Sequence, residues 1–210
     1  MLEKLMQYIT TKYMKFDNGT ITFGKEKVTI YFLSQLANEF LLNYKVCGMD
    51  YCAAMFLEGK EQGKTFVKTH GLPLKKVLTP IVGFALEILG TFGFGTFRTL
   101  KVDSKNGFMV IAGKSSIASE IKRKGKSIGI PIDFMLSWLF AGALETFSGR
   151  KMYCIETKCV ANKDVEECIW VVGDRTGINK YIKEFSPESK SLSKKVLDAI
   201  KAVEDKGVLD

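Results

Sequence analysis

A carboxylate and two thiols near the end of the chain have the spacing of a metal site. Glu156 and Cys159 lie three residues apart where a strand-like segment ends, and Cys168 follows nine residues later on the next such segment. Carboxylate and thiolate ligands suit a borderline-soft ion such as Zn2+. Residues three apart on a regular strand point to opposite faces, so convergence requires a bulge or turn near residues 157–158. The alternative is two cysteines that pack as small apolar residues beside a surface acid.

Other residues with chemical potential have less informative positions. Cys154 precedes Glu156 by two residues, so on a strand it faces the same side and could bind the ion, line a cavity or pack in the core. Cys47 and Cys52 have a poor spacing for a metal site, and His70, the one histidine, is placed to cap a helix end. No dinucleotide-binding or phosphate-binding motif is present. We therefore predict no catalytic residue and a binding protein rather than an enzyme.

The charge of the chain does not indicate a nucleic-acid partner. Thirty-one basic and 23 acidic residues leave a formal charge of +8 on 210 residues, of which 46% are hydrophobic. The densest basic runs, 122–126 and 190–206, lack the interleaved aromatic residues of a stacking surface. We expect no nucleic-acid binding by the chain itself, and a solvated Lys/Glu-rich surface of the kind found in archaeal and thermophilic proteins.

The N-terminal residues and the cysteine content predict a cytoplasmic location. The first residues lack the basic start and the apolar stretch of a secretory signal. The apolar run 77–97 is interrupted by Thr79, Pro80, Glu87 and several glycines, so we expect no membrane span. Five cysteines, an odd number, favour reduced thiols and metal ligands over disulfides.

Hydrophobic periodicity predicts intermixed helices and strands, and hence an α/β (α+β) fold with an antiparallel sheet and packed helices. Hairpins are expected over 19–30, over 96–102 with 107–113, and over 151–160 with 167–173. Helices are expected over 32–41, 51–69, 73–89, 116–123 with Ser115 as its cap, 131–147, and in the tail from 187.

This pattern divides the chain into a main domain with helical extensions. We expect a ligand-binding domain over 19–175, an N-terminal helical extension over 1–18 and a C-terminal helical tail over 176–210. The tail carries an apolar stripe that packs on its own domain or, alternatively, forms a dimer seam: Leu192, Val196, Ile200 and Val203.

Several of these residues together resemble the 4-vinyl reductase domain over roughly residues 19–173. The resemblance rests on Phe56-x2-Gly59-x3-Gly63, on Gly93-x-Gly95, and on Gly142-x6-Gly149-Arg150-x5-Glu156-x2-Cys159 followed by Cys168. It implies a fold shared with haem-type nitric oxide sensors and with small subunits of a Golgi transport complex. Family members include ligand-sensing domains of phenol-responsive activators, accessory proteins of bacteriochlorophyll synthesis and archaeal hydrocarbon-binding proteins.

The resemblance also implies a zinc site with four ligands. In the phenol sensors these are a Cys early in a helix and then the Glu, Cys and Cys of the motif. The first position falls on Asp133 in this chain, so the implied set is Asp133, Glu156, Cys159 and Cys168, which would hold a structural Zn2+. Alternatively, Asp133 only favours the dipole of its helix. The loop before Cys168 is one residue longer than usual and lacks the common glycine, and we expect Asn162 to take the positive φ there.

The ligand-binding relatives enclose an apolar cavity, and candidates to line it are aromatic, Met and Cys side chains. The phenol-binding His and Trp of the sensors have no clear equivalents. Core packing explains each candidate individually, and the implied cavity favours a ligand-lining role. The predicted lining residues are Phe84, Phe92, Phe94, Phe97, Met135, Trp138 and Cys154.

Two functions of different classes follow from these predictions. The first is a metal-stabilised domain that binds an apolar small molecule, such as a hydrocarbon, lipid chain or aromatic, for sensing or carriage. The second is a homodimeric interaction scaffold similar to the Golgi transport subunits, with helix 32–44 or the tail as the interface. An accessory role in tetrapyrrole vinyl reduction is a further alternative, although the chain has no recognisable site for a hydride or electron donor.

Overall fold

The computed structural model describes residues 14–17, 20–23, 26–28, 33–69, 78–91, 93–126, 129–131, 133–162 and 164–206. Predictions for His70, for the helix start at residue 73 and for Phe92 lie outside these residues. The same holds for residues 1–13 of the expected N-terminal extension.

A small antiparallel sheet precedes the helices. It consists of β1 (Met14–Asp17), β2 (Thr20–Phe23) and β3 (Glu26–Val28) in that order. The expected hairpin of 19–30 corresponds to the pairing of β2 with β3, in which Ile21 lies opposite Val28. Residues 14–17, expected to be part of a helical extension, form strand β1 and pair with β2.

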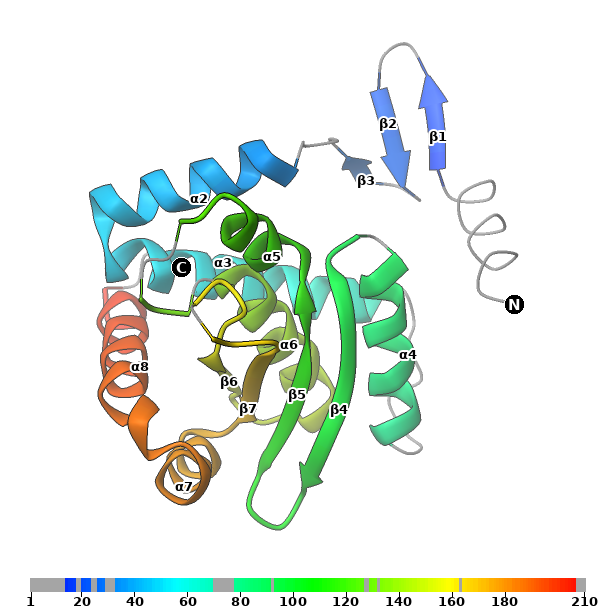
Figure 1. Cartoon of the computed structure of the whole chain (residues 1–210). Coiled ribbons are helices and arrows are strands. Elements are labelled where there is room, and N and C mark those ends of the chain that lie inside the picture. Colours follow the sequence, from blue (N-terminus) through cyan, green and yellow to red (C-terminus); the bar gives the residue numbers. More distant parts are fainter. Residues whose placement is uncertain are drawn as a thin grey trace.

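A four-stranded antiparallel sheet forms the centre of the molecule (Figure 1). Its strands are β4 (Gly95–Asp103), β5 (Phe108–Ser115), β6 (Tyr153–Lys158) and β7 (Cys168–Gly173), in the order β4-β5-β7-β6. The hairpins β4–β5 and β6–β7 confirm the pairings predicted from sequence alternation. Both central strands, β5 and β7, are buried along almost their whole length, so the hydrophobic core lies against them. The predicted α+β fold is confirmed.

Helices surround this sheet on several sides. They are α2 (Leu33–Cys47), α3 (Met49–Thr69), α4 (Leu78–Thr91), α5 (Ser116–Arg123), α6 (Phe134–Ser148), α7 (Arg175–Phe185) and α8 (Lys190–Glu204), with a 3-10 turn at Pro187–Ser189. In Figure 1, α3 and α6 lie behind the sheet, α4 runs along β4, and α7 and α8 lie on the side of β6 and β7. The hydrophobic core therefore lies between the sheet and these helices.

Two helix starts depend on side chains that the sequence singled out. Ser115 caps α5 as predicted, because its Oγ accepts a hydrogen bond from the Ala118 N–H at 3.2 Å. By contrast, α6 begins at Phe134 and not at Pro131, and Asp133 occupies the N-cap position without a side-chain capping bond. This helix start places the Asp133 backbone next to Glu156 of strand β6.

The C-terminal segment packs onto the same core as the rest of the domain. Asp174 caps α7 by accepting a hydrogen bond from the Gly177 N–H at 2.8 Å, and Ile178 and Ile182 of that helix are buried. In α8, Val196 and Ile200 are buried in the core cluster that also contains the strands. The apolar stripe of the tail is therefore covered by its own domain.

Helices α3 and α6 are in close contact where they cross. A Cβ added to Gly142 would lie 2.1 Å from the Lys60 carbonyl oxygen, and a Cβ added to Gly59 would lie 1.7 Å from the Trp138 ring. Real Cβ atoms do not tolerate such distances, so both glycines are required by the contact. The glycine spacing seen in the sequence is thus explained by helix packing.

A half-buried carboxylate stabilises the same pair of helices. Glu145 of α6 accepts hydrogen bonds from the Lys60 and Lys64 ammonium groups of α3, each at 2.7 Å, and from the Met152 N–H at 2.9 Å. Burial alone would raise the pKa of Glu145, but the two lysines and the Met152 amide outweigh it and lower the pKa below its usual value. Since only 5% of the Lys60 side chain is exposed, this lysine depends on Glu145 for its counter-charge.

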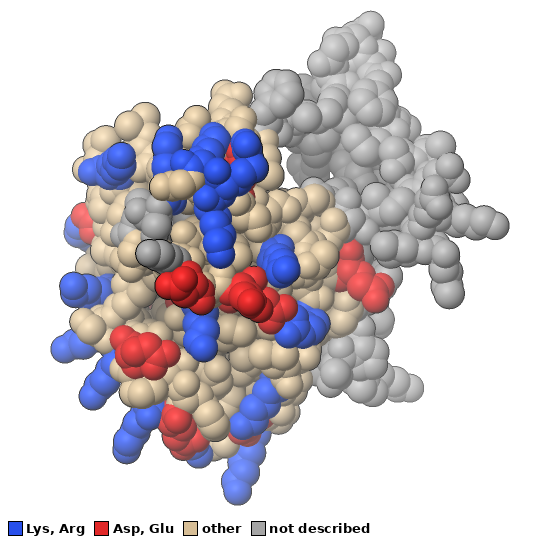
Figure 2. Space-filling view, viewed as in Figure 1, with Lys and Arg blue, Asp and Glu red and all other residues tan. Residues whose placement is uncertain are grey.

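The basic side chains of α5 form hydrogen bonds and ion pairs with other groups of the chain. Figure 2 shows Lys and Arg side chains gathered over α5. Among them, Arg123 donates two hydrogen bonds to Glu120, Lys122 donates to the Val165 carbonyl, and Lys124 donates to Ser34 of α2. The contacts of Lys122 and Lys124 connect α5 to its neighbours.

Substitution of Glu145 by Gln is expected to lower the free energy of unfolding by roughly 3 kcal/mol at pH 7, because it leaves the buried Lys60 charge uncompensated. The lowered pKa means that Glu145 contributes stability above its unfolded value of 4.5, which is lost as the pH falls through the folded pKa. Urea unfolding at several pH values between about 3 and 7 should therefore show a smaller acid-induced loss in the variant.

The control for this experiment is Glu61→Gln. Glu61 also pairs with Lys64, but 61% of its side chain is exposed, so its loss should cost less than about 0.5 kcal/mol. Equal effects of the two substitutions would contradict the role assigned to Glu145.

Candidate metal centre and apolar cavity

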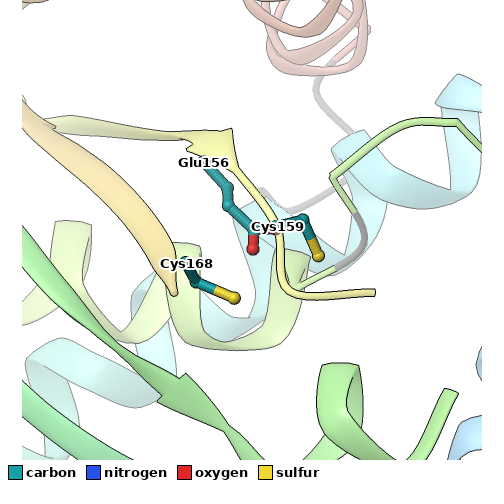
Figure 3. Close-up of side chains that lie close together, drawn as sticks. All are labelled: Glu156, Cys159 and Cys168. Atoms are coloured by element: carbon teal, nitrogen blue, oxygen red, sulfur yellow. The ribbon is translucent and has the colours of Figure 1, made fainter. Parts of the chain in front are cut away.

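Glu156, Cys159 and Cys168 converge at the end of the β6–β7 hairpin where the connecting loop begins and ends. One possible ligand atom from each lies within 4.8 Å of the others, and all three residues are buried. Figure 3 shows the three side chains directed toward one another. This is the only such group of three or more His, Cys, Asp or Glu side chains in the described part of the chain. The geometry is that of a site that could hold a cation between one oxygen and two sulfur atoms.

The convergence depends on an irregularity in strand β6. Glu156 pairs with Trp170, whereas Lys158 pairs with the adjacent Ile169, so the register shifts between Glu156 and Lys158. One extra residue in a strand reverses the side to which the following side chains point. Cys159 therefore returns to the side of Glu156. The bulge or turn predicted near residues 157–158 is confirmed.

The electrostatics of this cluster favour a positive charge at its centre. Burial raises the pKa of Glu156 well above its usual value, and the nearby Cys159 and Asp133 raise it further. At Cys168 the hydrogen bond with Cys159 lowers the pKa, but burial and the two acids outweigh it, and the net shift is upward. Glu156 Oε2 accepts a hydrogen bond from the Asp133 N–H at 2.9 Å, while its Oε1 is buried without a hydrogen-bond partner. A bound cation would satisfy this oxygen and stabilise the ionised thiols.

Asp133 lies beside this cluster without belonging to it. Its side chain is 1% exposed but is not among the three residues that approach within 4.8 Å of one another. Burial raises the pKa of Asp133 to about 6, although Ser115 and the Leu136 amide act in the opposite direction. No hydrogen bond of good geometry reaches either carboxylate oxygen. Its backbone contact with Glu156 shows proximity, and its role as a fourth ligand stays a prediction.

The loop between the two cysteines differs from the expectation. Among the non-glycine residues that the structure describes, the positive φ falls on Asp164, at 62°, and not on Asn162. The Asn162 N–H instead donates a hydrogen bond to the Cys159 carbonyl at 3.0 Å, which closes a turn directly after the second predicted ligand. The left-handed residue is displaced two positions along the longer loop, and Asp tolerates this conformation better than most residues.

An apolar cavity lies between α3, α4, α6 and strand β5. Its volume is about 30 Å3, close to the space of one water molecule. A ligand of several heavy atoms would have to displace part of the wall. The lining residues are Val67, Val82, Ala85, Leu86, Leu89, Ile111, Leu139, Phe140, Ala143, Leu144 and Phe147.

The predicted lining residues lie mostly elsewhere. Phe97 packs edge-on against Phe140 and Trp170, Phe94 packs against the core, and Trp138 covers Gly59 of α3. Cys154 borders a separate space of about 10 Å3 between α6, β6 and α8. The side chains of Phe84 and Met135 lie outside the described part of the structure.

Aliphatic residues of α4 and α6 form most of the wall and were missed, because the prediction favoured aromatic side chains. The signal that could have found them is the 3-4 residue spacing of Val82, Leu86 and Leu89, which marks the inner face of α4. Such spacing identifies the buried face of a helix, but it does not show whether that face borders a cavity.

Comparison with known proteins supports the fold assignment. No protein-family model matches the chain, and no curated protein matches it at a significant level. Among solved structures, the chain is similar to the crystal structure of the phenol-responsive sensory domain of the transcription activator PoxR with phenol. The two are 12% identical, with a TM-score of 0.67 over 86% of this chain and 95% of that chain. No helix among the described residues is both long and apolar enough to cross a membrane. At this level of identity the similarity shows a shared fold: this chain has the α+β fold of that sensory domain.

Proposed function

We propose that this protein is a metal-stabilised domain that binds an apolar small molecule for sensing or carriage. The observation that carries the proposal is the cavity enclosed by α3, α4, α6 and β5, lined almost wholly by apolar side chains, within the fold of a sensory domain crystallised with phenol. Membership of the 4-vinyl reductase family belongs to this proposal, and the order of Glu156, Cys159 and Cys168 supports it.

In this proposal the metal ion is structural. Glu156, Cys159 and Cys168 would hold Zn2+, and Asp133, at the N-cap of α6, would be the fourth ligand. Four protein ligands leave no open coordination position, so the ion would fix α6 to the β6–β7 hairpin rather than activate water. The buried and unpartnered Glu156 Oε1 supports such an ion.

We further propose that the protein works in the cytoplasm as a binding protein rather than an enzyme. All five cysteines are free thiols in the structure, four of them buried. This agrees with a reducing compartment and with the use of two thiols as ligands. A cavity without charged or nucleophilic lining residues offers binding and no chemistry.

Natively purified protein is expected to contain about one zinc ion per chain, measured by plasma mass spectrometry. Cys159→Ser should lose the ion and lower the melting temperature by about 5 °C or more, because a bound metal stabilises only the folded state. Cys47→Ser is the matched control, since Cys47 is exposed and outside the cluster. Full metal content and unchanged melting in Cys159→Ser would refute the metal site.

Toluene at saturating concentration is expected to raise the melting temperature of the wild-type protein by a few degrees, because it binds only the folded state. Ala85→Val adds two methyl groups at the cavity wall and should abolish this rise. Ala54→Val is the control, because Ala54 lies on the exposed side of α3 and carries the same helix-propensity cost. Thermal unfolding and calorimetric titration measure both effects, and equal responses of the two variants would exclude the cavity as the binding site.

A homodimer formed through α2 is a second proposal that concerns assembly. In this helix, Leu42 is 62% exposed and Val46 is 76% exposed, one turn apart on the same face. Light scattering at micromolar concentration should give twice the chain mass, and Leu42→Lys should shift it to the monomer. A monomeric wild-type protein would contradict the dimer without affecting the ligand-binding proposal.

A further inference from the structure

A second hollow, larger than the cavity and open to solvent, lies where the β4–β5 hairpin passes the end of α6. Its volume is about 90 Å3. The floor is apolar and includes the buried residues Met109, Leu144, Met152 and Val172, whereas Ser104, Ser148 and Arg150 provide the polar rim. Such a combination suits a ligand with one polar end and one apolar end.

This hollow and the cavity described above share one lining residue, Leu144. Leu144 borders both spaces and is 8% exposed. Strand β5 continues from one space to the other, because Met109 lines the hollow and Ile111, two residues further on the same face, lines the cavity. A rotation of Leu144 would therefore join the two spaces into one channel from the surface to the interior.

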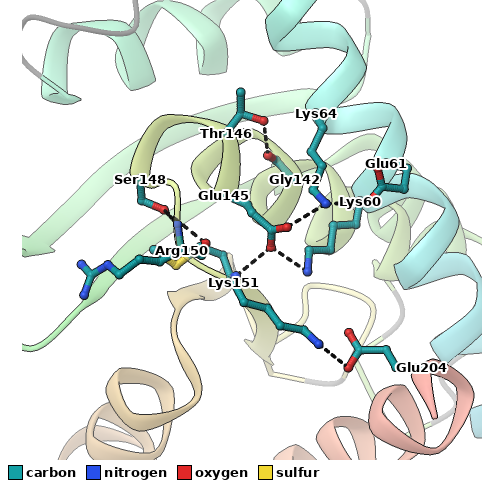
Figure 4. Close-up of polar contacts among 11 residues, drawn as sticks. Lys60, Glu61, Lys64, Gly142, Glu145, Thr146, Ser148, Arg150, Lys151 and Glu204 are labelled. Carbon is teal, nitrogen blue, oxygen red and sulfur yellow. Dashed lines mark hydrogen bonds and ion pairs between the residues drawn. The ribbon is translucent and has the colours of Figure 1, made fainter.

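Arg150 places a positive charge at the mouth of this channel. Its backbone position is fixed, because its N–H donates a hydrogen bond to Ser148 Oγ at 3.2 Å directly after Gly149 ends α6. Figure 4 shows its guanidinium group directed away from Glu145, whose carboxylate forms ion pairs with Lys60 and Lys64.

The guanidinium group of Arg150 is weakly engaged within the chain. Its ion pair is with Asp174 Oδ2 at 3.8 Å, beyond hydrogen-bond distance, and 61% of its side chain is exposed. The other carboxylate oxygen of Asp174 accepts a hydrogen bond from the Gly177 N–H, and in this way Asp174 caps α7. Arginine carries five N–H donors in a planar fork that matches a carboxylate. The Arg150 guanidinium group therefore has N–H donors available to an incoming carboxylate, which would compete with Asp174 Oδ2 for them.

We propose that the hollow is the entrance and head-group site for a small apolar carboxylate. The carboxylate binds Arg150 at the rim, and the apolar part passes Leu144 into the cavity between α4 and α6. This inference rests on the proposed ligand-binding function and narrows the ligand class from any apolar molecule to a monocarboxylate. The two volumes, about 90 and 30 Å3, together come close to the volume of about 150 Å3 of an engineered cavity in another protein that binds benzene. The apolar part is therefore a single ring or a short alkyl chain.

The test compares hexanoate with hexanamide, which has the same shape without the charge. At pH 7, calorimetric titration of the wild-type protein should give an affinity for hexanoate about three- to tenfold higher than for hexanamide, as expected for one partly exposed charge-assisted contact. Arg150→Gln should remove this preference. The control substitution Arg98→Gln changes the net charge by the same amount. It should keep the preference for hexanoate, because Arg98 is already paired with Glu167 at 2.6 and 2.8 Å. A preference that survives in Arg150→Gln would overturn the head-group site.

A second variant tests the channel. Leu144→Ala removes the side chain between hollow and cavity and should increase the affinity for hexanoate at least about threefold, provided that a folded protein is confirmed by circular dichroism. Unchanged affinity in the folded variant would overturn the role of Leu144. If toluene binds the wild-type protein but hexanoate does not, the carboxylate inference fails while the apolar-ligand function stands. If neither binds, both fail.

Discussion

The backbone contact between α3 and α6 is the constraint on which the rest of the structure depends. Gly142 must lack a side chain because the Lys60 carbonyl oxygen occupies its place. This close crossing holds α6 against the inner face of the sheet, with its N-cap at the candidate metal centre and its last turn at the solvent-exposed hollow. One helix thus connects both features, and Glu145 stabilises its position by a buried ion cluster with α3.

The candidate metal centre and the cavity are connected by side chains that pack against one another. Glu156 is the cross-strand neighbour of Trp170, and Trp170 packs edge-on against Phe140, which lines the cavity. A metal ion that fixes α6 to the β6–β7 hairpin would therefore also restrict movement of the cavity wall. In the proposed function, binding of the metal ion and binding of the ligand would be coupled through the position of α6. The cavity is small, so in the proposed function ligand entry would require movement of side chains in its wall, such as Leu144.

Much of the candidate metal centre could be predicted from the sequence because it depends on local features. The alternation of residues fixes the β6–β7 pairing, and three residues of suitable chemistry on adjacent strands can converge only through a bulge, which the structure contains between Glu156 and Lys158. Asp133 was harder to place. Its distance from the cluster depends on where α6 begins, and helix starts are decided by capping and tertiary packing rather than by periodicity.

The sequence by itself determined the antiparallel hairpins, most of the helices and the chemical types at the candidate metal centre, because each follows from local spacing and side-chain chemistry. Only the tertiary structure decided which apolar side chains border empty space. Phe97 and Trp138 are as apolar as Leu86 and Leu144, but the first two fill the core and the last two line the cavity. The physical reason is that the buried face of a helix or strand can be predicted from the residue spacing of that element alone. A cavity, in contrast, is a packing mismatch among several elements that meet only in the folded chain.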